Sequence, residues 1–390
     1  MDESNLPPAS GVPLPPPPPQ PPFAIPSAPP PPLSQSVRPV EPKSKKGRGW
    51  MIAAIILFLM LGFSVLMNFG QLVSGLGDVS GGQHHGAGPR LEEVTVKDSD
   101  GDDKIAVVPI EGVITSMRID GTGYSMVDVV KSQLKRAEKD KHVQAVLLKV
   151  DSPGGEVLAS DDIAKAIRKF QTDSSKPVIV SMGNLAASGG YYVSAPCRYI
   201  VANDLTITGS IGVIMSGLNY RGLMDKVGLR PQVFKSGKFK DMLSGSRDPD
   251  KIPQEELDMM QNMINEVYGR FTNVVATGRA NAHKANKDDG KALAADWANF
   301  ADGRVLTGNQ ALNLGLVDEL GDFDATVEKA KDIANISSAK LVEYRRVSDL
   351  SELFKMFGKT EAKPLKVDIG IELPKLKVGQ PYFLMDGYGN

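Results

Sequence analysis

From residue 104 onward, short apolar runs alternate with helix-like stretches, and this order predicts a sheet flanked by helices. Buried strands are predicted at Ile105–Ile114, Val143–Val150 and Val178–Met182, because each is a short run rich in apolar and β-branched residues. Met126–Asp140 has helical periodicity, and Ala159–Phe170 begins with acidic and ends with basic residues, as the helix dipole favours. The fold class we expect is therefore α/β, with a largely parallel sheet.

The same alternation continues and then leads into a long helix. Residues 199–215 predict two short strands around a turn, and Asn219–Val227 has a helix-like pattern. A polar loop over residues 232–250 precedes Pro253, which marks the start of a long amphipathic helix, and Ala325–Ile336 is the last helix predicted. We interpret the apolar stripe of the long helix as core or as a subunit contact; it consists of Leu257, Met260, Ile264, Val267, Phe271 and Val274.

An uncharged apolar block, Trp50–Phe69, stands apart from this pattern. Twenty helical residues at about 1.5 Å each span the hydrocarbon core of a bilayer, so we expect a transmembrane helix over residues 50–70. By the positive-inside rule, the basic residues before the block place the N-terminus in the cytoplasm; they are Lys43, Lys45, Lys46 and Arg48. We therefore expect a single-pass protein of the cell membrane whose remaining chain is extracytoplasmic.

Changes in composition divide the rest of the chain. Residues 1–49 are expected to be a disordered, proline-rich cytoplasmic tail, either simply solvated or a ligand for an SH3- or WW-like groove. Residues 71–103 are Gly-rich and then acidic, and we predict that they link the membrane to a folded domain at 104–345. The C-terminal tail, 346–390, ends in the apolar segment ELPKLKVGQPYFLM, which is either an edge strand or a mobile peptide.

Charge, cysteine and histidine content narrow the function classes. With 45 Lys and Arg against 46 Asp and Glu, the formal net charge is −1, which gives no electrostatic reason to expect nucleic-acid binding. The single cysteine, Cys197, excludes an intrachain disulfide, and the four histidines are not spaced as a Cys/His metal cluster. These counts give no reason to expect a metal site, and the activity implied by the resemblance described below requires neither a metal nor an organic cofactor.

Ser188 is the candidate nucleophile, within the stretch NLAASGGYY at residues 184–192. It follows the predicted strand Val178–Met182 and precedes small, helix-compatible residues. A hydroxyl at such a turn lies near unpaired backbone N–H groups that are able to hold a developing oxyanion. On its own, however, the stretch is also typical of a tight turn packed with small residues.

A serine nucleophile needs a base. His142 is the only histidine of the predicted α/β core before the long helix, and it lies between a helix and a strand. The alternative base is a lysine kept neutral by burial. The polar loop offers Lys235, Lys238 and Lys240, each of which is otherwise typical of a solvated surface.

Four motifs in order, NLAASGGYY, TGSIGVI, KSGKFKD and DGRVLTGNQALNLGLVDELG, resemble the signal peptide peptidase A family, in its short, single-module, membrane-anchored bacterial form. The resemblance covers about residues 104–340. It implies that Ser188 is the nucleophile and that Lys240, rather than Lys238, is the base. It also implies an oxyanion hole formed by the backbone N–H groups of Gly155 and Gly189. Ser210 would orient the lysine, with Thr208 as the fallback.

The resemblance further implies a ClpP/crotonase-like fold of repeated ββα units with outer helices. It implies a homo-oligomeric ring or dome in which neighbouring protomers supply the serine and the lysine. The activity implied is that of a serine endopeptidase that degrades remnant signal peptides and similar apolar peptides through a Ser–Lys dyad and an acyl-enzyme.

Three other interpretations remain open on the sequence. The chain could be a catalytically silent membrane scaffold on the same fold, or a crotonase-type acyl-CoA enzyme. In addition, the C-terminal segment within residues 365–390 could occupy the active-site groove as a self-inhibitory or self-processed peptide.

Overall fold

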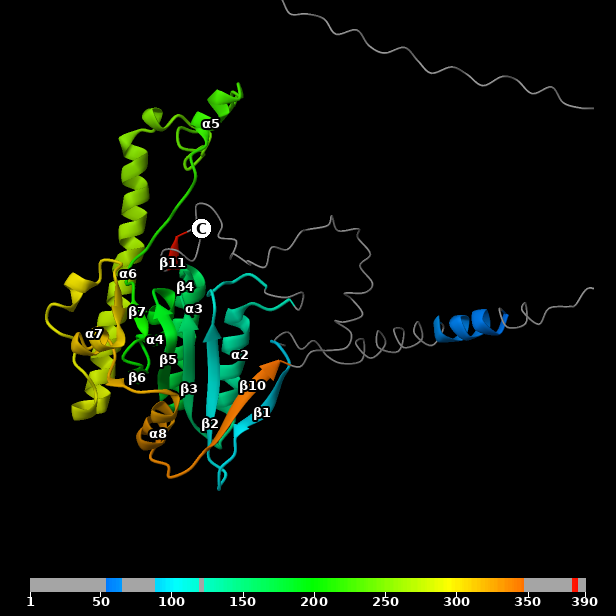
Figure 1. Ribbon diagram of the computed structural model, residues 1–390, viewed down its shortest axis with the longest axis vertical. Coiled ribbons are helices and arrows are strands. Elements are labelled where there is room, and N and C mark those ends of the chain that lie inside the picture. The colour runs from blue at the N-terminus through cyan, green and yellow to red at the C-terminus, as the bar shows by residue number, and fades with distance from the viewer. Residues whose placement is uncertain (1–53, 65–87, 119–122, 347–380, 385–390) are drawn as a thin grey trace, which may run out of the picture. The chain divides into compact units, whose positions relative to one another are not determined.

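The computed structural model describes residues 54–64, 88–118, 123–346 and 381–384, and the chain divides into two units, Met1–Gln83 and His84–Asn390 (Figure 1). In the first unit, residues 54–64 are helical and exposed. No helix among the described residues combines the length and apolar character needed to cross a membrane. The predicted span at 50–70 extends beyond the described helix at both ends, and the predicted tail at 1–49 lies outside the described residues.

A nine-stranded sheet forms the centre of the second unit, and most of its strand pairs are parallel. The two antiparallel pairs are β1 with β10 and β7 with β8. Along the main path the order is β1 (Leu91–Lys97), β10 (Lys340–Arg346), β2 (Lys104–Glu111), β3 (Val143–Ser152), β5 (Val178–Ala187), β6 (Tyr199–Ala202) and β9 (Glu319–Leu320). The strands off this path are β7 (Ile207–Gly209), which pairs with β5, and β8 (Val305–Thr307), which pairs with β7.

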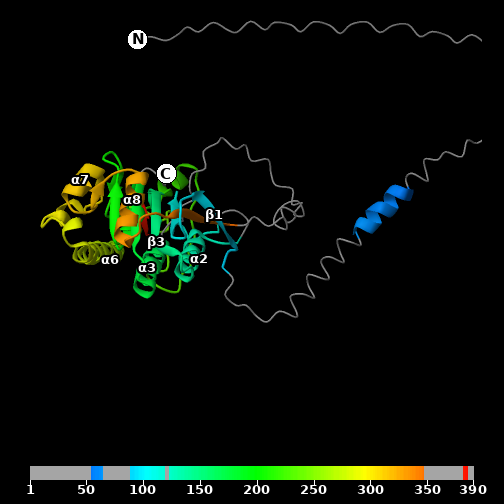
Figure 2. The same cartoon turned by 90° about the horizontal axis from the view of Figure 1, so that it is seen from below.

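Helices cover both faces of the sheet, as Figures 1 and 2 show. The helices α2 (Met126–Lys139) and α3 (Val157–Ser174) pack on one face, and α8 (Phe323–Ala334) packs on the other. Alternate residues of β3 serve the two sides: Val146 and Leu148 belong to the α2–α3 core, whereas Leu147 belongs to the α8 core, and all three are fully buried. A parallel sheet buried on both faces explains why its strands read as continuous apolar runs.

The long helix α6 (Gln254–Asn286) has 33 residues and is therefore about 50 Å long. Only its C-terminal half packs on the body of the unit, where Phe271 is fully buried and Arg279 forms a fully buried ion pair with Asp318 at 2.5 Å. Its N-terminal half, together with α5 (Arg221–Lys226) and the loops around it, extends away from the sheet (Figure 1). We call residues 215–266 the arm.

The mixed α/β architecture predicted from the sequence is confirmed, and so are the predicted strands and helices of the sheet and its covering layers. Two strands lie outside the predicted folded domain. The edge strand β1 lies inside the range expected to be a linker, 71–103, so the linker prediction is wrong for residues 91–97. The short strand β11 (Tyr382–Leu384) lies in the predicted C-terminal tail, and its pairing with another strand agrees with the edge-strand alternative for that segment.

Candidate active site

Ser188 occupies the turn between β5 and the fully buried helix α4 (Gly189–Ser194). Its φ of +53° is unusual for a residue other than glycine, and the turn is held by a hydrogen bond from Ser188 N to the Gly209 carbonyl at 2.9 Å. The side chain is only 1% exposed, and its Oγ has no hydrogen-bond partner among the described residues. A serine on a strained strand-to-helix turn is typical of a nucleophile elbow, and here its hydroxyl is covered by other parts of the domain.

A glycine backbone contact lies directly beside this serine. Gly154, with φ at +101°, approaches Gly189 so closely that a Cβ at position 154 would lie 2.6 Å from the Gly189 nitrogen. A Cβ at Gly189 would in turn lie 2.7 Å from Ser160 Oγ. Only glycine fits at either position, so the residue type follows from the close approach of two backbones. Sequence reasoning missed Gly154, although the doubled glycine of the SPGG turn is the signal that marks it.

Gly155 belongs to the short strand β4 (Gly154–Glu156), which Ile114 flanks on one side. Ile114 N donates to the Gly154 carbonyl and Glu156 N donates to the Ile114 carbonyl, both at 2.8 Å. Because neighbouring backbone groups in a strand point in opposite directions, the N–H of Gly155 faces away from Ile114. The Glu156 carboxylate fixes the adjoining loop by accepting hydrogen bonds from Thr115 Oγ1 at 3.0 Å and from Ser116 N at 2.9 Å.

The strand β11 lies on the other side of β4 and pairs with it in antiparallel register, with Phe383 opposite Gly155. Tyr382 also exchanges two backbone hydrogen bonds with Ile214, at 3.0 and 3.2 Å. The Phe383 carbonyl oxygen lies over the glycine contact, because Cβ atoms at Gly154 and Gly189 would lie 1.9 and 3.0 Å from it. The strand β11 thus crosses the site in an extended conformation.

The Phe383 side chain fills an aromatic cluster next to the nucleophile turn. It is fully buried, stacks on Tyr192 of α4 with ring centroids 4.7 Å apart, and lies 4.6 Å from the ring of Phe271. Burial, together with the neighbouring Asp161, raises the pKa of the Tyr192 phenol. This phenol therefore stays protonated and donates a hydrogen bond to Asp161 Oδ1 at 2.7 Å.

Ser210 lies next to the nucleophile turn, directly after Gly209, whose carbonyl accepts from Ser188 N. It has a φ of +46° and is 5% exposed. Thr208, the fallback for its role, is already engaged, because its hydroxyl donates to the Ala186 carbonyl at 2.7 Å. No hydrogen bond to the Ser210 hydroxyl is found among the described residues, so this hydroxyl is the better placed of the two to meet a further group.

Lys240 lies on the arm with its side chain exposed, so one chain on its own does not bring it to Ser188. Its two rivals in the same loop are tied to carboxylates: Lys235 binds Asp241 at 2.7 Å, and Lys238 binds Glu255. Within the described part of the chain, the Lys240 ammonium has no such partner. The structure therefore brings together Ser188, Gly155, Gly189 and Ser210. It leaves Lys240 away from them on the arm, with its ammonium group not paired to a carboxylate among the described residues.

His142 is not placed to act as the base. It precedes the first residue of β3, whereas the serine turn lies beyond the opposite end of that strand, beside Ser152. Ten strand residues at about 3.3 Å each separate the two ends by about 30 Å. Within one chain, His142 is therefore too far from Ser188 to accept its proton.

The glycine contact provides a direct test. Substituting Gly154→Ala would place a Cβ 2.6 Å from the Gly189 nitrogen of α4 and 1.9 Å from the Phe383 carbonyl oxygen of β11, so kcat/KM is expected to fall about 100-fold or more as β4 is pushed away from α4. Gly101→Ala is the matched control, because Gly101 has nearly the same φ (+100°) but meets only an ordinary contact at 3.5 Å. Peptide cleavage and thermal melting measured on both variants separate crowding at the site from backbone strain. Equal losses of activity in the two variants would contradict this account of Gly154.

Comparison with known proteins places this chain among peptidases. The family model of peptidase family S49 matches residues 170–337, a range that includes both Ser188 and Lys240. An Enterococcus faecium protein described as a signal peptide peptidase SppA is 38% identical over 259 residues, covering 65% of this chain and 71% of that protein. A protease of Synechocystis sp. is 35% identical over 290 residues, covering 72% and 95%. A protease of Methanocaldococcus jannaschii is 40% identical over 224 residues, covering 57% and 65%.

Proposed function

The chain belongs to peptidase family S49, and on this premise we propose that it is a membrane-anchored serine endopeptidase that degrades remnant signal peptides and similar apolar peptides. The observation that carries the proposal is the strained turn at Ser188, whose buried hydroxyl has no partner among the described residues and faces a contact of two glycine backbones. Hydrolysis of a synthetic signal peptide by the purified full chain tests it directly. Absence of cleavage would favour the silent scaffold.

The proposed chemistry uses a Ser–Lys dyad. Uncharged Lys240 accepts the Ser188 hydroxyl proton as Oγ attacks the peptide carbonyl carbon, and the N–H groups of Gly155 and Gly189 hold the resulting oxyanion. The lysine then gives the proton to the leaving amine, which departs and leaves an ester on Ser188. Water, deprotonated by the same lysine, hydrolyses this acyl-enzyme and restores the serine. Ser210 orients the lysine.

The substrate is proposed to bind as a strand beside β4, where β11 lies in this structure. Supporting this placement, β11 sets a carbonyl oxygen over the Gly154–Gly189 contact and a large apolar side chain against Tyr192 and Phe271. A strand-shaped groove accepts any unfolded backbone, since main-chain hydrogen bonds carry the affinity. The aromatic cluster then favours peptides with apolar side chains, as signal peptides have.

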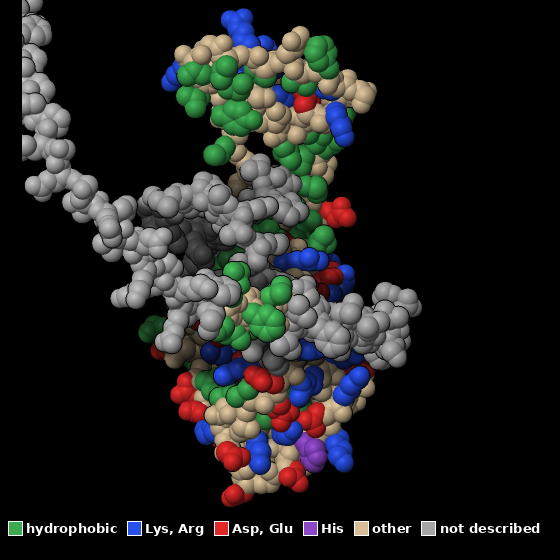
Figure 3. Space-filling view, turned by 90° about the vertical axis from the view of Figure 1, so that its right-hand side faces the viewer, with side chains coloured by type: hydrophobic (Ala, Val, Ile, Leu, Met, Phe, Trp, Pro, Cys, Tyr) green, Lys and Arg blue, Asp and Glu red, His purple; other side chains and the backbone are tan. Residues whose placement is uncertain are grey.

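Assembly into a homo-oligomeric ring or dome, on a ClpP/crotonase-like fold, is part of the proposal because Lys240 must reach Ser188 from another copy. Figure 3 shows apolar side chains gathered on the arm. Among them, Phe234 is 88% exposed and Leu218 is 83% exposed, values that indicate a covered surface in the assembled protein. Further exposed apolar residues of the arm are Leu223, Val227, Leu229, Val233, Leu243 and Leu257. A neighbouring protomer is the proposed cover.

Anchoring is proposed through residues 50–70, with the N-terminus cytoplasmic and the protease domain extracytoplasmic. The uncharged length of the Trp50–Phe69 block and the basic residues that precede it support this topology. In this arrangement the site would meet signal peptides where they are released, at the membrane.

The C-terminal strand is proposed to inhibit the enzyme, because it occupies the place assigned to the substrate. Deleting residues 365–390 removes β11 and is expected to raise kcat/KM severalfold, mainly through a lower KM, as the groove becomes accessible. Peptide cleavage by the truncated and full chains at equal concentration is the measurement. Adding a synthetic peptide with the sequence of residues 377–390 should then restore inhibition, and unchanged activity after the deletion would rule the idea out.

A further inference from the structure

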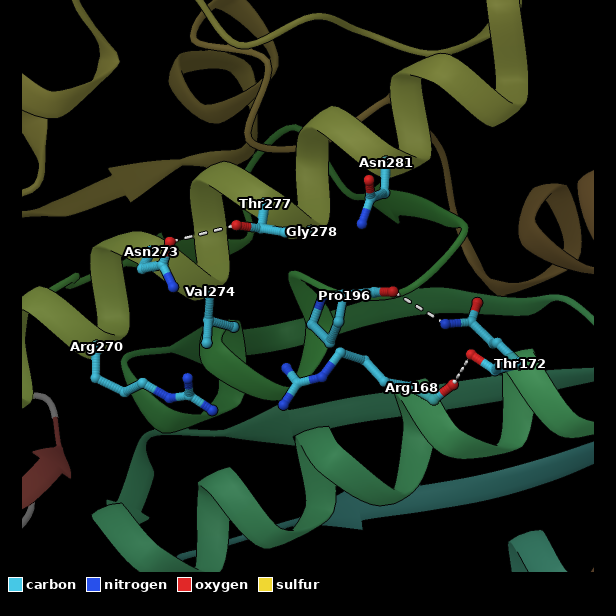
Figure 4. Close-up of a pocket in the computed structure, with 10 residues that line it drawn as sticks. Arg168, Thr172, Pro196, Arg270, Asn273, Val274, Thr277, Gly278 and Asn281 are labelled. Carbon is cyan, nitrogen blue, oxygen red and sulfur yellow. Dashed lines mark hydrogen bonds between the residues drawn. The ribbon is translucent and has the colours of Figure 1, made fainter.

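A cavity lies between α3 and α6, and none of the residues assigned to the proposed active site lines it. Its volume is about 440 Å³, and Figure 4 shows its lining. Val274, Gly278 and Pro196 contribute apolar surface, and the remaining lining side chains are polar or basic. Gly278 permits this packing, because a Cβ there would lie 2.5 Å from the Ala195 carbonyl oxygen.

Two arginines from different helices point into this cavity. Arg168 extends from α3 and Arg270 from α6, and their guanidinium groups face one another in Figure 4. No acidic residue lines the cavity. Among the described residues, no carboxylate pairs with Arg168, and Arg270 reaches only Asp161 at 3.4 Å, a carboxylate that also accepts the Tyr192 hydroxyl and the Lys165 ammonium. Two guanidinium groups that face one another, with little negative charge nearby to offset their repulsion, favour binding of an anion between them.

Neutral hydrogen-bonding groups extend the site along α6. Asn273, Thr277 and Asn281 follow at four-residue steps, so they form one polar stripe on the helix face that lines the cavity. Thr277 Oγ1 lies 3.4 Å from Asn273 Oδ1 and fixes the orientation of that amide, and Figure 4 shows the Asn281 amide nitrogen directed toward the cavity. The cavity thus combines two permanent positive charges with amide donors.

We propose that this cavity binds a phosphoryl group. A carboxylate is satisfied by a single guanidinium fork, whereas the tetrahedral phosphoryl group offers oxygens in several directions and matches two forks that approach from separate helices. The group belongs either to a free phosphorylated small molecule or to a lipid headgroup. Asp161 competes with it for Arg270.

Binding of inorganic phosphate to the full chain in neutral detergent, measured by isothermal titration calorimetry, is the test. Wild type is expected to bind saturably, and Arg168→Gln is expected to bind about tenfold more weakly or worse, because it loses a charge-assisted pair. Lys169→Gln is the matched control: it removes the same charge from the next residue, whose side chain is 76% exposed and pairs with Asp173. Its affinity should equal that of wild type.

Asp161→Asn gives a prediction of opposite sign. It keeps an oxygen for the Tyr192 hydroxyl but removes the competing charge, so phosphate should bind severalfold more tightly. Dioctanoyl phosphatidic acid distinguishes the sources: tighter binding than inorganic phosphate, lost in Arg168→Gln, indicates a lipid headgroup, and equal or weaker binding indicates a free phosphate compound. If neither probe binds wild type, or if Arg168→Gln binds as tightly as wild type, the proposal is overturned.

Discussion

Replacing Ser188 by alanine is expected to abolish peptide cleavage, with kcat falling by about 10⁴-fold or more. The substitution removes the nucleophile itself. Without a serine hydroxyl, the proposed base has no proton to accept, and the proposed oxyanion hole has no acyl-transfer intermediate to stabilise. Stability should not fall with activity. The Ser188 hydroxyl is buried without a partner among the described residues, so its removal is expected to leave the free energy of unfolding unchanged or to raise it by about 1 kcal/mol. Loss of activity with a gain in stability would mark a catalytic residue.

The control is Ser194→Ala, on the same short helix. Ser194 is also fully buried, but its hydroxyl donates to the Gly190 carbonyl at 2.8 Å. This variant should keep its activity and lose some stability, the opposite of Ser188→Ala. Labelling by a serine-reactive fluorophosphonate should occur in wild type and in Ser194→Ala and be absent in Ser188→Ala. Cleavage or labelling that persists in Ser188→Ala would refute the nucleophile assignment, and a wild type that resists labelling would favour the scaffold.

The central fold was predictable because its strands are buried on both faces. Residues such as Val146 and Leu147 serve cores on opposite sides of the sheet, so the centre of β3, Ala145–Leu148, is continuously apolar and its pattern is unambiguous. The edge strand β1 (LEEVTVK) carries no such signal, since most of its residues are exposed. Its strand character depends on pairing with β10, more than 240 residues later in the chain, and local composition does not report such a partner.

The site divides in the same way. The turn at Ser188 was predictable because a strand followed by small residues restricts the local backbone. The role of Gly154 depends on how closely β4 approaches α4, and the position of β11 depends on a groove that forms only in the folded domain.

The apolar stripe of the long helix could be interpreted from the sequence either as core or as a subunit contact, and the structure gives the reason. The stripe belongs to the core at Phe271 and Val274 but is exposed at Leu257, because α6 leaves the body of the domain partway along its length.

The position of Lys240 is the strongest argument for assembly. Lys240 is exposed on an apolar arm, so it lacks the burial that would favour its neutral, basic form. It also lies apart from the serine of its own chain. Packing of the arm against another copy would bring Lys240 to the serine of that copy. It would also bury the lysine, because apolar side chains such as Phe234 and Leu218 would exclude water around the dyad. The same contact would complete the site and cover the apolar surface, so activity and assembly should be inseparable.

Lys240→Ala is therefore expected to be as inactive as Ser188→Ala, and yet a mixture of the two inactive chains should cleave peptides. When equal amounts are dissociated and reassembled together, about one site in four receives an intact serine from one protomer and an intact lysine from its neighbour, so about a quarter of wild-type activity should return. The double variant carrying both substitutions, mixed with Ser188→Ala, is the matched control and should restore nothing, because no chain in that mixture has the serine. Lys238→Ala should keep its activity, since that lysine is tied to Glu255. If Lys240→Ala is fully active, the lysine is not the base; if it is inactive and mixing restores nothing, the two residues do not come from neighbouring protomers.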